Sequence, residues 1–404
     1  MSVCKSQSAS FGVTKVLVAT LSLLFLATVC SAQETCTTPK GRTGSCINLR
    51  NCSYLVEILK LPRPLPDGAL ELLRGSQCGF EGHSPKVCCE IQQRTTEPPV
   101  TVTTGDPARS ETTPPSPPDV TMHPNLRLLD HDLCGPITQQ RIFGGNKTGV
   151  FDFPWMALIA YQTRNGPEFR CGGSLINKRY VLTAAHCVTN LPSGLVLTGV
   201  RLGEHDISKE RDCDKDEDGL EVVCAERYQD FGVANSYYFP NYSRVLLHDD
   251  IGLIRLDRDA DLRPASVRPI CMPIGIAATI SQKKVTVTGW GATERGPRSQ
   301  DLLKVFVAPV PNAQCAETYR RSTQIWYKQI CAGGHKGMDS CAGDSGGPLQ
   351  APALYSVNGS SNDVKYVQYG IVSFGPTNCG SEGFPGVYTR VTYYLDWILN
   401  TMRE

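Results

Sequence analysis

The sequence lacks a marked excess of charge of either sign. Lysine and arginine number 40 and aspartate and glutamate 39, which gives a formal net charge of +1 over 404 residues, and no long basic run occurs. Nucleic acids and acidic membrane surfaces attract proteins through concentrated positive charge, so both are poor candidates as partners. The sequence also lacks a visible internal repeat, and its N-terminal apolar run, VLVATLSLLFLATV, is too short to span a bilayer comfortably.

Cysteine, by contrast, is abundant. The 18 cysteines, which include the adjacent pair Cys88-Cys89, are far more than a reduced cytosolic compartment normally supports, so they indicate an oxidising one. The N-terminus agrees, because Lys5 and Lys15 precede the apolar run and the run ends in Cys-Ser-Ala at residues 30–32. We therefore predict a signal peptide over residues 1–32 and a secreted mature chain with an even number of cysteines.

The mature chain divides into three sections. Residues 33–90 contain six cysteines spaced C-x9-C-x5-C-x25-C-x9-C-C, in a segment too small to be stable on its apolar core alone, which predicts a disulfide-rich module. Residues 91–141 are rich in Pro and Thr and nearly without aromatics, which predicts an extended linker that ends in the stretch QQRIFGG. Residues 142–404 show an all-β pattern of short strand-like runs and close with one stretch of helical spacing.

Three stretches of the last section supply side chains for nucleophilic catalysis. CAGDSGGPL places Ser345 between glycines, which allow the backbone to turn its N–H groups toward one point where a developing oxyanion could lie. LTAAHC supplies His186, and HDDIGLIRL supplies Asp250. A serine hydroxyl is a weak nucleophile, so it needs an imidazole to accept its proton and a carboxylate to fix the tautomer of that imidazole.

Each of these residues also has an ordinary structural interpretation. A serine in a glycine-rich loop is usually a turn residue, and most histidines are surface or structural residues. Asp249 competes directly with Asp250. We choose Asp250 because it directly precedes the apolar IGLI and would enter the buried strand, whereas Asp249 would stay outside. The three motifs, found together in this order, favour a catalytic triad.

On these motifs, residues 142–404 resemble a trypsin-like serine protease of the chymotrypsin family. The whole mature chain resembles the arthropod clip-domain serine proteases, which join a six-cysteine clip domain to such a protease. The resemblance implies two six-stranded antiparallel β-barrels with a C-terminal helix, preceded by the small clip domain, and an active site between the barrels. It also implies an oxyanion hole formed at Gly343 and Ser345.

The stretch RIFGG resembles the activation site of this family. Cleavage after Arg141 would free the α-amino group of Ile142, which would turn inward and pair with the carboxylate of Asp344. Either charge is costly to bury alone, so each stabilises the ordered loop only when the other is present. The resemblance thus implies a zymogen, although Arg141 taken alone could be an ordinary solvated arginine.

The resemblance also implies the substrate pocket. Asp339 lies six residues before Ser345, at the position that forms the pocket floor in trypsin-like enzymes, and Ser340 follows it. A carboxylate there would attract an Arg or Lys side chain, the alternative being a solvated surface aspartate. Small residues would form the walls and leave room for a long basic side chain: Ser373, Gly375 and Gly386.

The disulfide pairs are implied by the resemblance alone, since six cysteines in the clip segment allow fifteen connectivities. The pair between Cys134 and Cys271 would keep the clip and the linker attached after activation. The full set is Cys36 with Cys88, Cys46 with Cys78, Cys52 with Cys89, Cys134 with Cys271, Cys171 with Cys187, Cys213 with Cys224, Cys315 with Cys331, and Cys341 with Cys379.

No cofactor is required by triad chemistry, but residues 213–226 are acidic. They open with EF-hand spacing, yet Ala225 stands where the glutamate should be, so the EF-hand interpretation fails. Two alternatives remain: a solvated acidic loop, or a structural calcium site like that of several relatives, with Glu204 and Glu226 as ligands. Glycosylation is expected at three sequons: Asn146, Asn241 and Asn358.

We therefore expect a secreted endopeptidase of an innate-immune cascade in arthropod haemolymph. By resemblance its partners would be prophenoloxidase, clip-protease zymogens or a Toll-ligand precursor, with serpins as inhibitors. A digestive-type trypsin is one alternative, although it would have little use for a clip domain and a long linker. A non-catalytic clip-domain adaptor is another, but such relatives usually lack the serine, and here all three triad residues are present.

Overall fold

The structure is a computed structural model, and the chain divides into two compact units, Met1–Ser110 and Glu111–Glu404, which are described separately. The signal peptide, the activation site and two of the three sequons lie outside the described residues. The structure describes residues 35–39, 43–49, 52, 55, 69–81, 84–90, 114–138, 148–293, 296, 298–335, 341, 343–357, 363–376 and 379–404.

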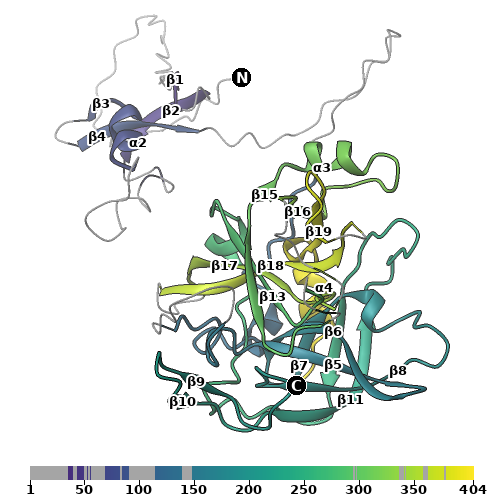
Figure 1. Cartoon of the computed structure of the whole chain (residues 1–404). Coiled ribbons are helices and arrows are strands. Elements are labelled where there is room, and N and C mark those ends of the chain that lie inside the picture. Colours follow the sequence, from purple (N-terminus) through teal and green to yellow (C-terminus); the bar gives the residue numbers. More distant parts are fainter. Residues whose placement is uncertain are drawn as a thin grey trace, which may run out of the picture. The chain divides into compact units, whose positions relative to one another are not determined.

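The first unit contains a small antiparallel sheet. Its strands are β1 (Thr35–Thr37), β2 (Thr43–Asn48), β3 (Gln77–Glu81) and β4 (Ser84–Glu90), in the order β1-β2-β4-β3, with helix α2 (Ala69–Gly75) before β3 (Figure 1). Among the described residues of this unit, a buried hydrophobic cluster contains Cys52, Leu55 and Val87, with a few half-buried neighbours. Three disulfides join the six cysteines, which agrees with a small module stabilised by cross-links.

The second unit begins with a closed six-stranded barrel (teal in Figure 1). The order around the barrel is β11-β12-β7-β6-β5-β8, and β11 closes it by pairing with both β12 and β8. A short hairpin, β9 (Cys213–Lys215) and β10 (Glu221–Cys224), leaves the barrel after β8. The barrel strands are β5 (Met156–Thr163), β6 (Gly166–Asn177), β7 (Tyr180–Thr183), β8 (Val196–Leu202), β11 (Gln229–Tyr238) and β12 (Gly252–Leu256).

A seven-stranded antiparallel sheet follows (green to yellow in Figure 1), in the order β14-β13-β17-β18-β19-β16-β15. Its two edge strands, β14 and β15, are separated in the chain by Ala308 alone, so the sheet must curl until its ends meet. Counted as one bent strand, they make this the second six-stranded barrel. The strands are β13 (Val285–Gly289), β14 (Leu303–Val307), β15 (Pro309–Val310), β16 (Gln329–Gly333), β17 (Pro348–Tyr355), β18 (Asp363–Phe374) and β19 (Pro385–Arg390).

Short helices connect and close these barrels. The expected C-terminal helix is present as a 3-10 turn, η5 (Val391–Tyr394), that continues into α4 (Leu395–Thr401). The other helical segments of the second unit are η2 (Pro124–Leu128), η3 (Ala185–Cys187), η4 (Gly275–Ala278) and α3 (Asn312–Tyr319).

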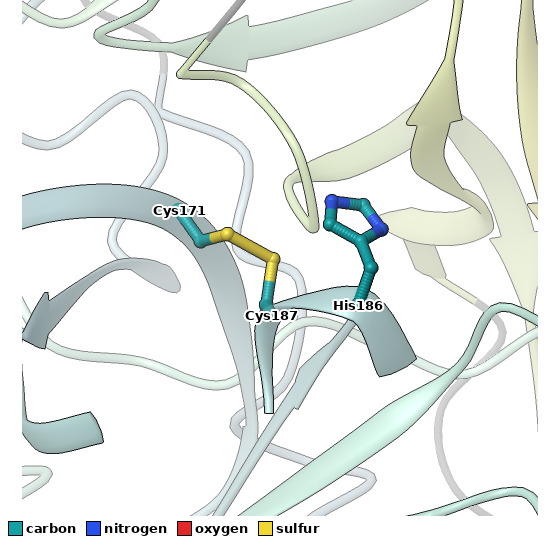
Figure 2. A group of neighbouring side chains, drawn as sticks. All are labelled: Cys171, His186 and Cys187. Atoms are coloured by element: carbon teal, nitrogen blue, oxygen red, sulfur yellow. A yellow bond between two sulfur atoms is a disulfide. The ribbon is translucent and has the colours of Figure 1, made fainter. Parts of the chain in front are cut away.

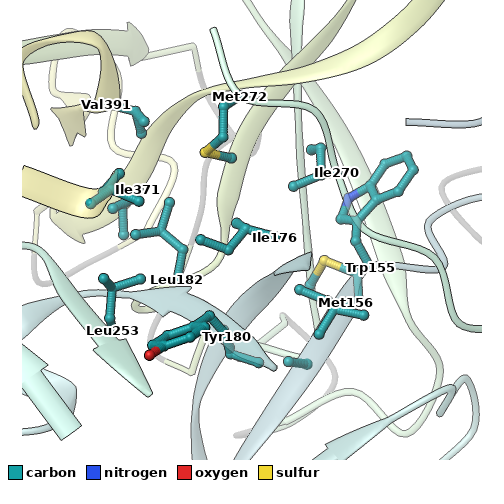
Figure 3. Close-up of a cluster of buried hydrophobic side chains, with 14 of the residues drawn as sticks. Trp155, Met156, Ile176, Tyr180, Leu182, Leu253, Ile270, Met272, Ile371 and Val391 are labelled. Atoms are coloured by element: carbon teal, nitrogen blue, oxygen red, sulfur yellow. The ribbon is translucent and has the colours of Figure 1, made fainter. Parts of the chain in front are cut away.

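One apolar cluster joins the two barrels. Figure 3 shows Tyr180, Leu182 and Leu253 of the first barrel in the same buried group as Ile371 of the second. Buried polar groups also connect the two sheets, because Trp155 Nε1 donates to Gln350 Oε1 over 2.6 Å. The barrels are thus held as one body, which fixes the loops that meet between them.

The segment 114–138, here called the strap, packs against the protease barrels. Val120, Leu126 and Leu129 are buried in their apolar cluster, and Asn125 Nδ2 donates to Leu399 O in the C-terminal helix over 2.8 Å. The Pro/Thr composition predicted a linker without packed structure up to Arg141, and the structure differs over this part. The reason is that a few apolar residues are enough to order a segment when they pack against a surface formed by other parts of the chain.

Eight disulfides cross-link the described cysteines, and they join the same eight pairs that the resemblance implied. The bond between Cys134 and Cys271 ties the strap to the segment between the two barrels. Asn241, the one predicted glycosylation site among the described residues, is exposed.

Candidate active site

His186 lies on the short turn η3, directly after the buried strand β7. Its neighbour Cys187 is bonded to Cys171 of β6, which anchors the turn to the barrel wall. Figure 2 shows the imidazole on the same side of the turn as this disulfide and next to it. The side chain keeps 31% of its exposure, so the ring is anchored yet accessible.

Asp250 holds the imidazole through two contacts. Its Oδ2 accepts from His186 Nδ1 over 2.8 Å, and its Oδ1 accepts from the backbone N–H of His186 over 3.0 Å. Ser373 Oγ also donates to Oδ2, over 2.6 Å, and the aspartate is 1% exposed. Because an ionised carboxylate only accepts, Nδ1 must carry the proton, which leaves Nε2 with a lone pair.

The electrostatic environment of His186 favours its role as a base. Burial alone would lower the pKa of the imidazole, but the charge of Asp250 and the hydrogen bond to it outweigh burial, and the net shift of the pKa is upward. The aspartate therefore stabilises the imidazolium that forms when a proton is accepted.

Ser345 lies in a tight turn next to the histidine turn. Its carbonyl oxygen accepts from Gly172 N over 2.8 Å and lies 3.7 Å from Cys187 Sγ, so it packs beside the residue that follows His186. Gly346 has φ of 83°, and a Cβ there would lie 2.2 Å from Thr183 Oγ1. Only glycine fits this position, so the sequence around Ser345 is set by close packing against β7 as well as by the turn.

Asp344 is half-buried, and both of its carboxylate oxygens accept backbone hydrogen bonds. Its Oδ1 accepts from Gly291 N over 2.8 Å and its Oδ2 from Cys341 N over 2.9 Å. Burial raises the pKa of this carboxyl to about 6, against these two hydrogen bonds, which lower it. The charge of Arg298 already lowers this pKa, and an ammonium in contact with the carboxylate would lower it further. The partner expected from the sequence, the amino group of Ile142, and the cleavage residue Arg141 lie outside the described residues.

The predicted pocket residues are described only in part. Gly375 and Gly386 face each other, since a Cβ on Gly375 would lie 3.9 Å from Gly386 Cα. Ser373 directs its hydroxyl at Asp250, a contact that sequence reasoning missed. The predicted floor, Asp339 and Ser340, lies outside the described residues.

The acidic loop places a different carboxylate beside Glu204 from the one expected. Glu226 is exposed and contacts Ser266 Oγ at 3.4 Å, whereas Glu204 is buried. Burial, with a contribution from the charge of Asp212, raises the pKa of Glu204 to about 7. Asp212 itself is 7% exposed, and its Oδ1 is buried without a hydrogen-bond partner. The sequence offered no sign of this pairing among so many aspartates.

Two groups of described residues have metal-like spacing, but both are built on disulfides. One is Cys171, His186 and Cys187, and the other is Cys213, Glu221 and Cys224. The cysteines of each group are bonded to each other, so neither offers a free thiolate. No helix among the described residues has the length and apolar character needed to cross a membrane.

A double barrel that presents a buried aspartate, a histidine and a serine between glycines defines a serine hydrolase of the double-barrel type. Comparison with known families is in agreement: the model described as Trypsin matches residues 142–398, and the model described as the regulatory CLIP domain of proteinases matches residues 36–89. The chain belongs to the trypsin family of serine proteases and, within it, to the clip-domain serine proteases. It is a trypsin-like serine endopeptidase.

Similar proteins come from insects. Melanization protease 1 of Drosophila melanogaster is 42% identical over 91% of this chain and 93% of that protein. Phenoloxidase-activating enzyme 1 of Spodoptera litura is 39% identical, over 92% of this chain and 94% of that protein. Among solved structures, the drosophila Grass clip serine protease of the Toll pathway has a TM-score of 0.62 and 33% identity, and the match covers 92% of this chain and 97% of that chain.

Proposed function

We propose that this protein is a secreted zymogen that is activated by cleavage after Arg141 and then cuts protein substrates after Arg or Lys in an extracellular innate-immune cascade. The observation that carries the proposal is the doubly held His186, whose Nδ1 and backbone N–H both bind the buried Asp250. This geometry leaves Nε2 as the base of a serine endopeptidase.

In the proposed mechanism, Ser345 Oγ attacks the scissile carbonyl carbon while His186 Nε2 takes the hydroxyl proton. Asp250 keeps its own charge and stabilises the imidazolium. The backbone N–H groups of Gly343 and Ser345 donate to the oxyanion, and His186 then returns the proton to the leaving amine as the C–N bond breaks. Water repeats the sequence, with its proton passing to His186, and hydrolyses the acyl ester to regenerate Ser345.

Activation is proposed to act through Asp344. Its carboxyl has two backbone N–H donors and a pKa raised to about 6, so that the ionised form gains from a nearby ammonium. The new amino group of Ile142 would supply this charge once the bond after Arg141 is cut. Pairing would then stabilise the turn that carries Ser345 and the oxyanion donors.

The proposed specificity for Arg and Lys rests on Asp339 as a counter-charge. The facing glycines Gly375 and Gly386 support it, because the absence of side chains there leaves space for a long substrate side chain. Cys341 is bonded to Cys379, which ties the segment after Asp339 to the segment that contains these glycines.

The cascade role follows from the relatives. Melanization protease 1 and the phenoloxidase-activating enzyme carry their functions in their names, and both align over nine tenths of this chain. We propose the same kind of substrate here: prophenoloxidase or a clip-protease zymogen directly upstream of it, ahead of a Toll-ligand precursor. Secretion into haemolymph and inhibition by serpins belong to the same proposal.

The test compares three proteins: the natural zymogen, Arg141→Gln and Ser345→Ala. Each is treated with an activating protease and offered prophenoloxidase, a clip-protease zymogen and a Toll-ligand precursor, with N-terminal sequencing of the products. The natural zymogen should cut one of these after Arg or Lys. Arg141→Gln should stay uncut and inactive, and Ser345→Ala should be cut but lose roughly 10⁴- to 10⁶-fold in turnover. Near-normal peptidase activity in either variant would contradict the assignment.

We also propose a structural calcium ion at the acidic loop, held by Glu204 and Asp212. The support is the buried Oδ1 of Asp212, which has no hydrogen bond, beside a second buried carboxylate. Hard cations prefer such oxygen ligands, and a bound calcium would add to the charge of Arg201, whose Nη1 lies 3.1 Å from Glu204 Oε2. Its role would be to order the loop rather than to take part in the chemistry.

A further inference from the structure

Asp249, the residue before the catalytic aspartate, was expected to stay outside, and that prediction is wrong. Its side chain is only 6% exposed. Its φ is 55°, in the left-handed region that L residues seldom adopt, and Leu247 two residues earlier has φ of 56°. A backbone of this kind persists only where its surroundings hold it.

Two groups bind the carboxylate of Asp249. Tyr394 Oη donates to its Oδ1 over 2.8 Å, and Lys328 Nζ lies 3.5 Å from the same oxygen. Burial, together with the charge of Asp249, raises the pKa of Tyr394, so the phenol keeps the proton that it donates. Lys328 directly precedes β16, and Tyr394 is the last residue of η5. Segments far apart in the chain therefore contact this one residue.

Aromatic rings confine the ammonium of Lys328. Its Nζ lies 5.3 Å from the ring centroid of Phe239, 5.2 Å from that of Trp326 and 5.1 Å from that of Tyr394. Such ring faces attract a cation and exclude water from one side of it. The side chain of Lys328 is therefore fixed in direction, unlike that of a lysine in solvent.

The rest of the loop that leads to Asp249 is held by the same segment, residues 323–329. Thr323 Oγ1 donates to Leu246 O over 2.8 Å, and Gln329 Nε2 donates to Leu247 O over 2.9 Å. His248 stacks on Trp326 with ring centroids 4.5 Å apart. The segment thus contacts four successive residues, 246 to 249.

Asp250 directly follows the anchored residue, and Thr389 Oγ1 donates to its carbonyl oxygen over 2.7 Å. Ile251 N donates to Asp249 O over 2.9 Å, which places Asp250 at the centre of a three-residue turn. Its two oxygens bind two different groups of His186, so a rotation of the turn would break at least one of these contacts. We propose that Lys328 and Tyr394 are positioning residues, which hold Asp249 so that Asp250 keeps its two contacts with His186.

The first test is Lys328→Met in the activated full-length enzyme, measured with an amide substrate after active-site titration. Displacement of the Asp250–His186 pair slows the chemical step and leaves the substrate pocket in place. We therefore expect kcat to fall roughly tenfold, with KM changed less than about twofold. Lys328→Arg, which keeps a cation among the rings, should recover most of the loss.

Lys304→Met is the matched control. Lys304 forms a similar pair with Asp152 at 3.1 Å and lies over the ring of Phe153, and its side chain is 24% exposed against 19% for Lys328. This variant should keep kcat within about twofold, because the pair does not adjoin the triad. Equal losses in the two variants would overturn the proposal and indicate a general effect of removing a half-buried lysine.

Asp249 variants separate the effect of the backbone conformation from the effect of the side-chain contacts. Glycine adopts φ of 55° freely, so Asp249→Gly keeps the conformation accessible and removes both contacts, whereas Asp249→Asn keeps an acceptor for Tyr394. We expect Asp249→Gly to lose kcat about tenfold and Asp249→Asn to lose less. Full activity of Asp249→Gly would show that the contacts are dispensable and would refute the proposal.

Tyr394→Phe covers the case in which Lys328→Met fails to fold. It removes one hydroxyl from a fully buried ring and should lower kcat about threefold to tenfold at unchanged KM. If Tyr394→Phe is folded, as judged by thermal unfolding, and its kcat is unchanged, the positioning role of Tyr394 is refuted. The proposal rests on the proposed triad roles, and the two can fail separately: an inactive natural enzyme refutes the triad, while an active one with unaffected variants refutes only the anchoring.

Discussion

The strap should contribute as much to the stability of the protease unit as a core strand, although it lies outside the 142–398 match to the trypsin family. Leu126 is the test residue, because it sits in η2 with only 3% exposure. Truncation of a buried leucine to alanine costs about 2–5 kcal/mol, for lost transfer energy and for the cavity left behind. In a unit of this size each kcal/mol lowers Tm by roughly 2–4 °C, so Leu126→Ala should lower Tm by roughly 4 to 20 °C.

The assay is calorimetric unfolding of the uncleaved chain in the Ser345→Ala background, which removes self-digestion. Met122→Ala provides the matched control, since Met122 lies in the same strap and is 92% exposed. Exposed substitutions usually change stability by no more than about 0.5 kcal/mol. If Leu126→Ala unfolds within about 1 °C of Met122→Ala, the strap is not part of the folded unit and the reasoning is refuted.

Four further outcomes are expected. Asp339→Ser should selectively lose peptides with Arg or Lys before the cut, because their side chain would be buried without a counter-charge, while a retained preference would contradict the pocket assignment. Cleaved protein should give one band on gels without reductant and two with it, because Cys134 is bonded to Cys271. Calcium chelation should lower the Tm of the natural protein, and Asp212→Asn should abolish that response; an equal response in both would remove Asp212 from the site. The acid limb of kcat/KM should lie above the ordinary histidine value of 6.5, because Asp250 raises the pKa of His186 and the base acts only when neutral; a limb below it would contradict this electrostatic assignment.

Much of the fold and of the site follows from local sequence signals. Alternation of apolar residues and abundant turn residues indicate the strands, and the glycines around Ser345 indicate a turn that only small residues allow. Asp250 could be chosen over Asp249 because it directly precedes a buried strand, and it is the one that binds His186. Each of these sequence signals covers only a few residues, and the strand, the turn or the triad residue that it predicts is equally local.

What the sequence did not reveal depends on partners far away in the chain. Asp249 is drawn inward by Lys328 and Tyr394, which lie 79 and 145 positions away. Asp212 pairs with Glu204 only because the loop between them folds back. The strap has the composition of a linker, and its order comes from a surface made by other segments. In each case the local composition is compatible with exposure, and tertiary contacts decide the outcome.

The order in which the chain is made leaves its first barrel unfinished until residues 394–403 have been synthesised. All six strands of that barrel are complete at Leu256, yet Phe239 is covered by Tyr394 and Trp397, and Tyr180 Oη accepts from Arg403 N. Arg403 lies 147 positions after Leu256, and synthesis of that length of chain takes roughly 7 to 30 s at ordinary elongation rates. During this interval Phe239 and Tyr180 of the nascent barrel lack these contacts, so residues 394–403 complete the N-terminal barrel long after its own strands have been made.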